Sequence, residues 1–108
     1  MDGKFFDISK LAIEREQRGR PYFEFLRIAA LSAGVYVLPA SSTDPQKPHK
    51  QDELYYVVSG RARMKVAAED REVRTGSVIF VAADVEHRFY EIREELVVLV
   101  FFAPAESN

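Results

Sequence analysis

Two side chains that could bind a metal ion, His49 and Glu53, stand four positions apart in a stretch rich in aromatic and β-branched residues. Side chains alternate across an extended strand, so residues of equal parity share a face. If residues 47–57 are extended, one face carries Lys47, His49, Gln51, Glu53, Tyr55 and Val57. An imidazole and a carboxylate that converge in this way form a ligand pair suited to Zn, Fe, Mn, Ni or Cu.

A third ligand is available in His87, the only other histidine of the chain, which follows Gly76 by eleven residues. If the two hairpins lie side by side, the set becomes two histidines and one carboxylate with open coordination positions. The chain has no cysteine, so disulfides, thiolate ligands and a cysteine nucleophile are excluded. We therefore expect a divalent ion held by nitrogen and oxygen: Fe, Mn, Ni or Zn.

Length and composition indicate one compact domain. The chain has 108 residues, of which 47% are hydrophobic, and a formal net charge of −2. This balance gives no basic field for nucleic acid, so no nucleic-acid partner is expected. The N-terminus lacks the pattern of a secretory signal, and no apolar run approaches the roughly 20 residues of a membrane span. We predict a cytoplasmic protein with no membrane partner and a small molecule as its ligand or substrate.

The order of the elements predicts an all-β, antiparallel fold of jelly-roll type with a short N-terminal arm. Residues 1–21 are expected to form the arm, with at most one turn of helix, and residues 22–108 a single β-barrel domain. Turn signals at 59–60, 69–70 and 75–76 divide the predicted strands, which cover 22–31, 34–40, 52–58, 61–68, 71–74, 77–83, 86–92 and 95–105. Residues 39–48 are predicted to form a loop over the mouth of the barrel.

The segment Leu96–Phe102 is apolar on both faces, which an edge strand in water would not tolerate. The strand is either central or covered by a partner. Together with the aromatic side chains of Tyr22, Phe23 and Phe25, the segment favours a homodimer. The alternative is that the N-terminal arm folds across this face in the same chain.

Around His49 the sequence resembles the first motif of the cupin family, a glycine followed by His-x-His, three or four residues, a glutamate, six residues and a glycine. His49 matches the second histidine, Glu53 the glutamate and Gly60 the closing glycine. The resemblance implies a small single-domain cupin with a double-stranded β-helix fold, similar to a bacterial group of uncharacterised stand-alone cupins. It covers roughly residues 22–104.

The second cupin motif follows in order with matching spacing. It runs glycine, five residues, Pro-x-Gly, two residues, histidine, three residues and asparagine. At these positions the chain has Gly76, Ala82, Asp84, His87 and Glu91. The resemblance thus implies a metal site at His49, Glu53 and His87.

One ligand of the family pattern is replaced, because Lys47 stands where the first histidine belongs. A protonated lysine cannot bind a cation. Three arrangements are open: Gln46 turns inward and offers its amide oxygen, water completes the coordination sphere, or no metal binds and Lys47 balances Glu53 in the pocket. The pocket is predicted to be lined by Tyr36, Lys47, Tyr55, Phe89 and Phe101.

Two functions remain open at this stage. The first is a metal-dependent enzyme, within the resemblance a dioxygenase, isomerase or decarboxylase-like protein, acting on a small organic substrate. The alternative is a non-catalytic cupin that binds a small ligand or serves as a sensor, with or without metal; a poorer hypothesis is a degenerate barrel kept for its dimer interface. The fold alone does not choose, because one barrel hosts many functions.

Overall fold

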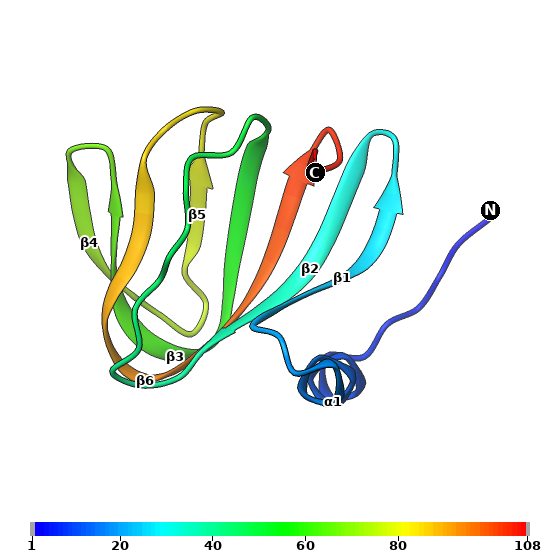
Figure 1. The fold of residues 1–108 in the computed structure, drawn as a ribbon, viewed down its shortest axis with the longest axis horizontal. Coiled ribbons are helices and arrows are strands. Elements are labelled where there is room, and N and C mark those ends of the chain that lie inside the picture. The colour runs from blue at the N-terminus through cyan, green and yellow to red at the C-terminus, as the bar shows by residue number, and fades with distance from the viewer. Residues whose placement is uncertain (1, 108) are drawn as a thin grey trace.

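The computed structural model describes residues 2–107 and contains one helix and one six-stranded antiparallel sheet (Figure 1). The helix α1 spans Ile8–Arg18. The strands are β1 (Tyr22–Ile28), β2 (Leu31–Leu38), β3 (Asp52–Val66), β4 (Glu69–Arg74), β5 (Val78–Val81) and β6 (His87–Ala103). They are ordered β1-β2-β6-β3-β4, and β5 pairs with β3 beside this path. The predicted all-β jelly roll is confirmed.

The two longest strands, β3 and β6, bend and belong to both layers of the barrel. In one layer, residues 52–57 of β3 pair with β5 and with residues 98–103 of β6, which continues to β2 and β1. In the other layer, residues 61–66 of β3 pair with β4 and with residues 87–94 of β6. The two layers form a curved cup that is open at its upper end in Figure 1.

The predicted turn at 59–60 is wrong, because β3 passes through this position as a bulge. Gly60 has φ +102°, and a Cβ atom there would lie 2.2 Å from the carbonyl oxygen of Glu95. Glycine therefore lets the two bent strands approach closely without ending either of them. The predicted break between 92 and 95 is likewise absent, since β6 is continuous, and the turn predicted at 69–70 lies at Ala67–Ala68.

The main core fills the space between the two layers. Its largest fully buried hydrophobic side chains are Tyr55, Phe89 and Leu96. A second, smaller cluster lies on the outside of the sheet, where Leu11 of α1 packs with Val35 and Val37 of β2. Val97 and Leu99 of β6 pack against this cluster as well. The cluster around Leu11 thus covers part of the apolar second face of β6, at Val97 and Leu99, within the same chain.

The prediction of at most one helical turn in residues 1–21 is wrong, since α1 has 11 residues, about three turns. The helix is stabilised by the packing of Leu11 on the sheet, by Arg15 and Arg18 in its last turn, and by Gly19 in the left-handed conformation at its end. Met1 and Asn108, the outermost residues of the predicted arm and domain, lie outside the described residues. Within residues 2–107, no helix combines the length and apolarity that a membrane crossing requires.

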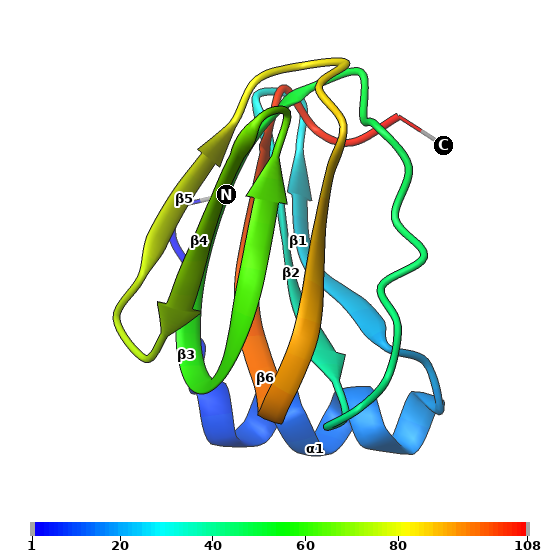
Figure 2. The ribbon, with the colours of Figure 1, turned by 90° about the vertical axis from the view of Figure 1, so that its left-hand side faces the viewer.

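Residues 39–51 form an irregular loop along the side of the barrel opposite β5 (Figure 2). The carboxylate of Asp44 fixes this loop, because it accepts hydrogen bonds from the Tyr36 hydroxyl at 2.7 Å and from the backbone N–H of Phe89 at 2.9 Å. The loop is further tied by the N–H of Asp84, which donates to the His49 carbonyl at 2.7 Å. These contacts bring residues 44–49 to the inner face of the barrel.

Candidate metal centre

His87 is the first residue of β6 and lies with its side chain completely buried. Its Nδ1 is 2.9 Å from the carbonyl oxygen of Val85. A carbonyl only accepts, so Nδ1 carries the proton and Nε2 presents its lone pair to the interior. Burial lowers the pKa of His87, but the Glu53 carboxylate and the Val85 carbonyl more than offset this effect, so the pKa of His87 is raised.

Glu53 faces His87 from β3, and its side chain is 1% exposed. Its Oε1 lies 3.2 Å from His87 Nε2, although the two atoms do not meet in hydrogen-bond geometry. Within residues 2–107, neither carboxylate oxygen of Glu53 has a hydrogen-bond partner, and neither does His87 Nε2. A buried carboxylate without hydrogen-bond partners costs on the order of several kcal/mol, so this arrangement calls for a positive charge beside Glu53, either protonated His87 or a bound cation.

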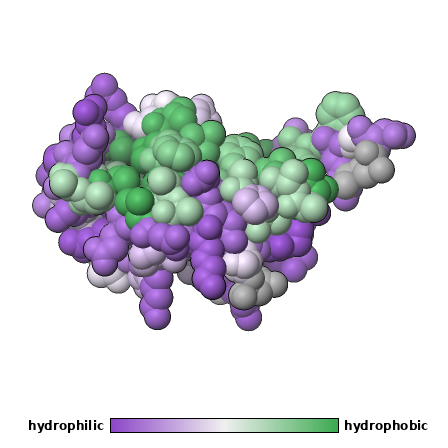
Figure 3. Space-filling model, turned by 90° about the horizontal axis from the view of Figure 1, so that it is seen from above, coloured by the Kyte–Doolittle hydropathy of each residue, from purple (hydrophilic) through white to green (hydrophobic). Residues whose placement is uncertain are grey.

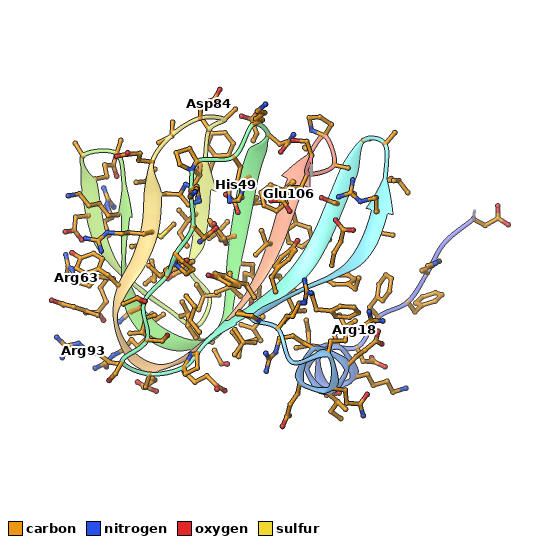
Figure 4. The ribbon with its side chains drawn as sticks, in the orientation of Figure 1. Arg18, His49, Arg63, Asp84, Arg93 and Glu106 are labelled. Atoms are coloured by element: carbon orange, nitrogen blue, oxygen red, sulfur yellow. The ribbon has the colours of Figure 1, made fainter. Side chains whose placement is uncertain are left out.

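His49 completes the cluster from the loop, with 21% of its side chain exposed. Its Nδ1 is 3.1 Å from Oε2 of Glu106, and its Nε2 points to the interior, 3.9 Å from Oε1 of Glu53. Figure 4 shows His49 and Glu106 next to each other at the upper end of the barrel. Potential ligand atoms of His49, Glu53 and His87 lie within 4.8 Å of one another, close enough for one metal ion.

Gln46 adds a fourth donor atom, an amide oxygen, to this cluster. Its Oε1 lies 3.2 Å from His49 Nε2 and accepts a hydrogen bond from the Tyr55 hydroxyl at 2.7 Å. Its Nε2 donates to Asp44 at 2.8 Å, which fixes the orientation of the amide. The side chain of Gln46 is thus held in place with its oxygen toward the histidines.

The donor set fits a divalent cation. If Nδ1 of each histidine donates outward, the inner atoms are two imidazole lone pairs, the Glu53 carboxylate and the Gln46 amide oxygen. All four are electron-pair donors, and no proton is left to place between them. Imidazole, carboxylate and amide oxygen are ligands for Zn, Fe, Mn and Ni.

The other predicted pocket residues fall into two groups. Tyr36, Tyr55 and Phe89 are buried on the inner face, with Phe89 packed edge-on against Tyr55 at 5.2 Å between ring centroids. Phe101 does not close the floor of the pocket. It has the parity of the outward residues of β6, and its neighbour Phe102 takes this place with its ring 4.9 Å from that of His49.

Lys47 does not share the inner face with Glu53. Its side chain is exposed, and no ion pair between Lys47 and Glu53 occurs within the described residues. Strand alternation does not apply here, because residues 39–51 are irregular and β3 begins only at Asp52. Lys47 instead borders a cavity of about 380 Å³ that adjoins the cluster, because Gln46 and His87 line it together with Lys65 and Arg88.

A smaller cavity of about 150 Å³ lies on the inner side of the cluster. Glu53, Gln46 and Glu106 form its polar boundary, and its apolar walls include Tyr22, Tyr36, Val100 and Phe102. The Tyr22 hydroxyl is buried without a hydrogen-bond partner among residues 2–107. The Tyr22 ring can lie there because β2 has Gly34 opposite it, where a Cβ atom would be 2.3 Å from the ring.

Three contributors to the site were not anticipated from the sequence: Asp44, Phe102 and Glu106. Asp44 and Glu106 stand outside both motifs, in segments without strand periodicity. Phe102 could have been found from parity, since Val98, Val100 and Phe102 alternate along β6 and are all buried. For Glu106 no local signal exists, because its contact with His49 joins residues 57 positions apart.

Comparison with known proteins agrees with this geometry. Residues 34–102, well over half of the chain, match the family model of the cupin domain. The chain belongs to the cupin family. This cupin is 49% identical over 104 residues to an uncharacterised protein of Streptomyces coelicolor, a match that covers 96% of this chain and 99% of the relative.

Solved structures show the same fold. The TT1209 protein from Thermus thermophilus superposes with a TM-score of 0.76 at 22% identity, over 95% of this cupin and 99% of that chain. The DMSP lyase DddQ from Ruegeria pomeroyi superposes with a TM-score of 0.66 at 22% identity, over 70% of this cupin. This cupin spans only 39% of the lyase chain. At these identities the similarity shows the shared fold alone.

Proposed function

We propose that this cupin is a metal-dependent enzyme that acts on a small organic substrate, with dioxygenase- or isomerase-like chemistry. The observation that carries the proposal is the convergence of donor atoms from His49, Glu53, His87 and Gln46, among which the buried atoms of Glu53 and His87 have no hydrogen-bond partner within the described residues. When bound, the ion would supply a Lewis acid or an oxygen-activating centre. The fold similarity to a lyase supports the barrel as a scaffold for catalysis.

Each side chain of the site has its own proposed role. His49, Glu53 and His87 would hold the ion, and Gln46 would add a weaker oxygen ligand or orient a bound water. The 150 Å³ cavity beside Glu53 would take the substrate, since its walls are mainly apolar. Its volume is below that of pockets for drug-sized ligands, about 300–1,000 Å³, and therefore suits a small molecule. The free Tyr22 hydroxyl can donate one hydrogen bond to a polar group of that substrate.

The first test is elemental analysis of protein purified without an affinity tag or chelator. Wild-type protein is expected to carry near-stoichiometric metal, and the double variant His49→Ala/His87→Ala none. Glu94→Gln, which changes an exposed carboxylate, serves as the control and should keep the metal. Wild-type protein that is metal-free and also rejects added Fe, Mn, Ni and Zn would sink the proposal.

A second measurement separates an enzyme from a barrel with an enclosed structural ion. An active centre keeps an exchangeable position, whereas a structural ion is enclosed by protein ligands. Protein loaded with Mn²⁺ should therefore enhance the relaxation of bulk water protons through a bound, exchanging water. Bound Mn²⁺ without such enhancement would favour the non-catalytic alternative.

We further propose that the protein forms a homodimer, with a second copy covering an apolar surface on β3 and β5. This surface consists of the exposed side chains of Leu54, Tyr56, Val78 and Phe80, which are neighbours in the β3–β5 register. In Figure 3 apolar surface gathers along one side of the molecule and hydrophilic surface along the other. A two-fold axis would place two equal patches on each other.

The dimer is tested by sedimentation equilibrium. Wild-type protein should be a dimer, and Phe80→Glu, which places a charge in the apolar surface, should be a monomer. A monomeric wild type would refute the proposed dimer.

A further inference from the structure

We propose that Glu106 is a positioning residue that holds His49 in the tautomer with its proton on Nδ1, so that the Nε2 lone pair faces Glu53 and His87. Only the consequence for metal affinity rests on the proposed function. The pair of Glu106 and His49 can be tested in the metal-free protein.

The contact between the two side chains is direct and partly shielded from water. Oε2 of Glu106 lies 3.1 Å from Nδ1 of His49, and the side chains of His49 and Glu106 are 21% and 26% exposed. A carboxylate accepts a hydrogen bond from Nδ1–H and repels the lone pair of the other tautomer. The opposite nitrogen, Nε2, lies 3.2 Å from the Gln46 amide oxygen and 3.9 Å from the Glu53 carboxylate, so these two acceptors compete with Glu106 for the single proton of the neutral ring. Glu106 is the nearest of the three acceptors and carries a full charge, which favours the proton on Nδ1.

The segment that carries Glu106 is built into the structure. After β6 the chain crosses the upper end of the sheet and is fixed there by four hydrogen bonds: Ala105 N–H to the Ala29 carbonyl at 3.3 Å, Glu106 N–H to Ser32 Oγ at 2.8 Å, Arg27 Nη2 to the Glu106 carbonyl at 2.7 Å, and Gln51 Nε2 to Ser107 Oγ at 3.0 Å. Two of these bonds hold the backbone of Glu106 itself. The carboxylate therefore meets His49 from a fixed backbone, in contrast to an exposed ion pair between mobile side chains, which contributes little.

The contact with Glu106 gives the His49 ring an orienting partner that its own loop lacks. His87 has the Val85 carbonyl two residues away to fix its ring. His49 has no such backbone acceptor among the hydrogen bonds of the described residues, and Glu106 takes that role from the other end of the chain. Partners that bind the outer nitrogen of a metal-binding histidine orient the ring and raise its basicity, and their loss typically costs about 10–100-fold in metal affinity.

The direct test is the tautomer of His49 in the metal-free protein, read from the ¹⁵N chemical shifts of its ring at a pH where the ring is neutral. Wild type should show the proton on Nδ1. Glu106→Ala should shift the population toward Nε2–H, and Glu106→Gln should largely keep the wild-type tautomer, because its amide oxygen still accepts. A wild-type spectrum in Glu106→Ala would overturn the proposal.

The second readout is the dissociation constant for Co²⁺, followed by its visible absorption. Glu106→Ala should bind Co²⁺ about 10–100-fold more weakly than wild type, with Glu106→Gln between the two. Glu94→Ala, which removes an exposed carboxylate paired with Arg61, should bind like wild type. Equal affinity of Glu106→Ala and wild type would contradict the positioning role.

The two readouts separate the failure of this inference from the failure of the proposed function. If wild type binds no metal, the metal-dependent function is wrong, but the tautomer measurement still decides the role of Glu106. If wild type binds metal and both Glu106 variants match it in tautomer and affinity, the site is real and the inference is wrong. Far-ultraviolet circular dichroism of each variant confirms that the barrel is folded.

Discussion

His87 and His49 face the same carboxylate from two differently built parts of the molecule. His87 begins a strand, is wholly buried, and has its ring fixed by a carbonyl two residues away. His49 lies in an irregular loop, is one-fifth exposed, and has its ring held by Glu106 near the C-terminus. One histidine is thus positioned by local structure and the other by contacts between segments distant in sequence.

A short sequence motif can therefore specify the position of His87, whereas the position of His49 depends on the rest of the fold. A ligand fixed by its own strand is rigid as soon as the barrel forms. A ligand on a loop needs the Asp44 hydrogen bonds and the C-terminal segment to bring it into place. Substitutions should therefore affect the two histidines differently.

The largest effect is expected at the carboxylate that both histidines share. Glu53→Gln removes the only negative charge among the inner donors, so metal affinity should fall by more than about 100-fold, beyond the range for outer partners. Isothermal titration with Zn²⁺ or Mn²⁺ measures this. An affinity within about tenfold of wild type would show that Glu53 is not a ligand, since a lost ligand costs more than a lost outer partner.

Single alanine substitutions in the metal-free protein compare the contributions of the two histidines to the free energy of unfolding. His87→Ala removes the imidazole nearest to the buried Glu53 carboxylate, which can carry the opposite charge, and should lower the free energy of unfolding by about 3 kcal/mol. His49→Ala changes a partly exposed contact and should cost less than about 1 kcal/mol. Urea denaturation with chelator present gives both values. Equal losses in the free energy of unfolding for the two variants would contradict this expected difference between His87 and His49.

Positions 46 and 47 test which loop residue faces the ion. Gln46→Ala removes the inward oxygen and should weaken metal binding by about tenfold. Lys47→His restores the family histidine in sequence, but residue 47 points outward, so affinity should not change. Titration with Ni²⁺ measures the metal affinity of both variants. Tighter binding in Lys47→His would show that the loop can turn residue 47 inward.

The pH dependence should reflect the raised pKa of His87. In the metal-free protein, protonated His87 beside Glu53 stabilises the fold at low pH, and this contribution is lost as pH rises through the raised pKa. Metal binding needs the unprotonated ring, so affinity should fall as pH drops through that same value, above the ordinary histidine value of about 6.5. Melting temperatures across pH, with and without Zn²⁺, test both slopes. Metal affinity that is constant down to about pH 6 would contradict this.

Much of the barrel could be predicted because its signals are local. Alternation of apolar residues identified the strands, and parity along residues 51–57 placed Gln51, Glu53, Tyr55 and Val57 on the inner face, where all four are buried. The turn at Thr75–Gly76 follows from its residue types. The bulge at Gly60 was predicted as a turn, because the sequence does not distinguish a glycine that lets two strands approach closely from a glycine that ends a strand.

Other features escaped prediction because they depend on distant contacts. The residues of α1 showed weak helical character alone, and the helix gains its stability from Leu11 packing on β2. Pairing of β3 with β6 sets Lys65 opposite Arg88 beside the cavity that Lys47 borders, and this grouping joins residues from separate segments of the chain.

The fold class, the cupin motifs and three of the inner donor residues can be predicted from the sequence, because strand periodicity and motif spacing depend on neighbouring residues. Three other features depend on the folded chain: Gln46 rather than Lys47 turns inward, Phe102 rather than Phe101 contacts His49, and Glu106 contacts the loop histidine. The reason is physical: in an irregular loop and a chain end, no periodicity fixes the direction of a side chain, and hydrogen bonds to distant segments do so.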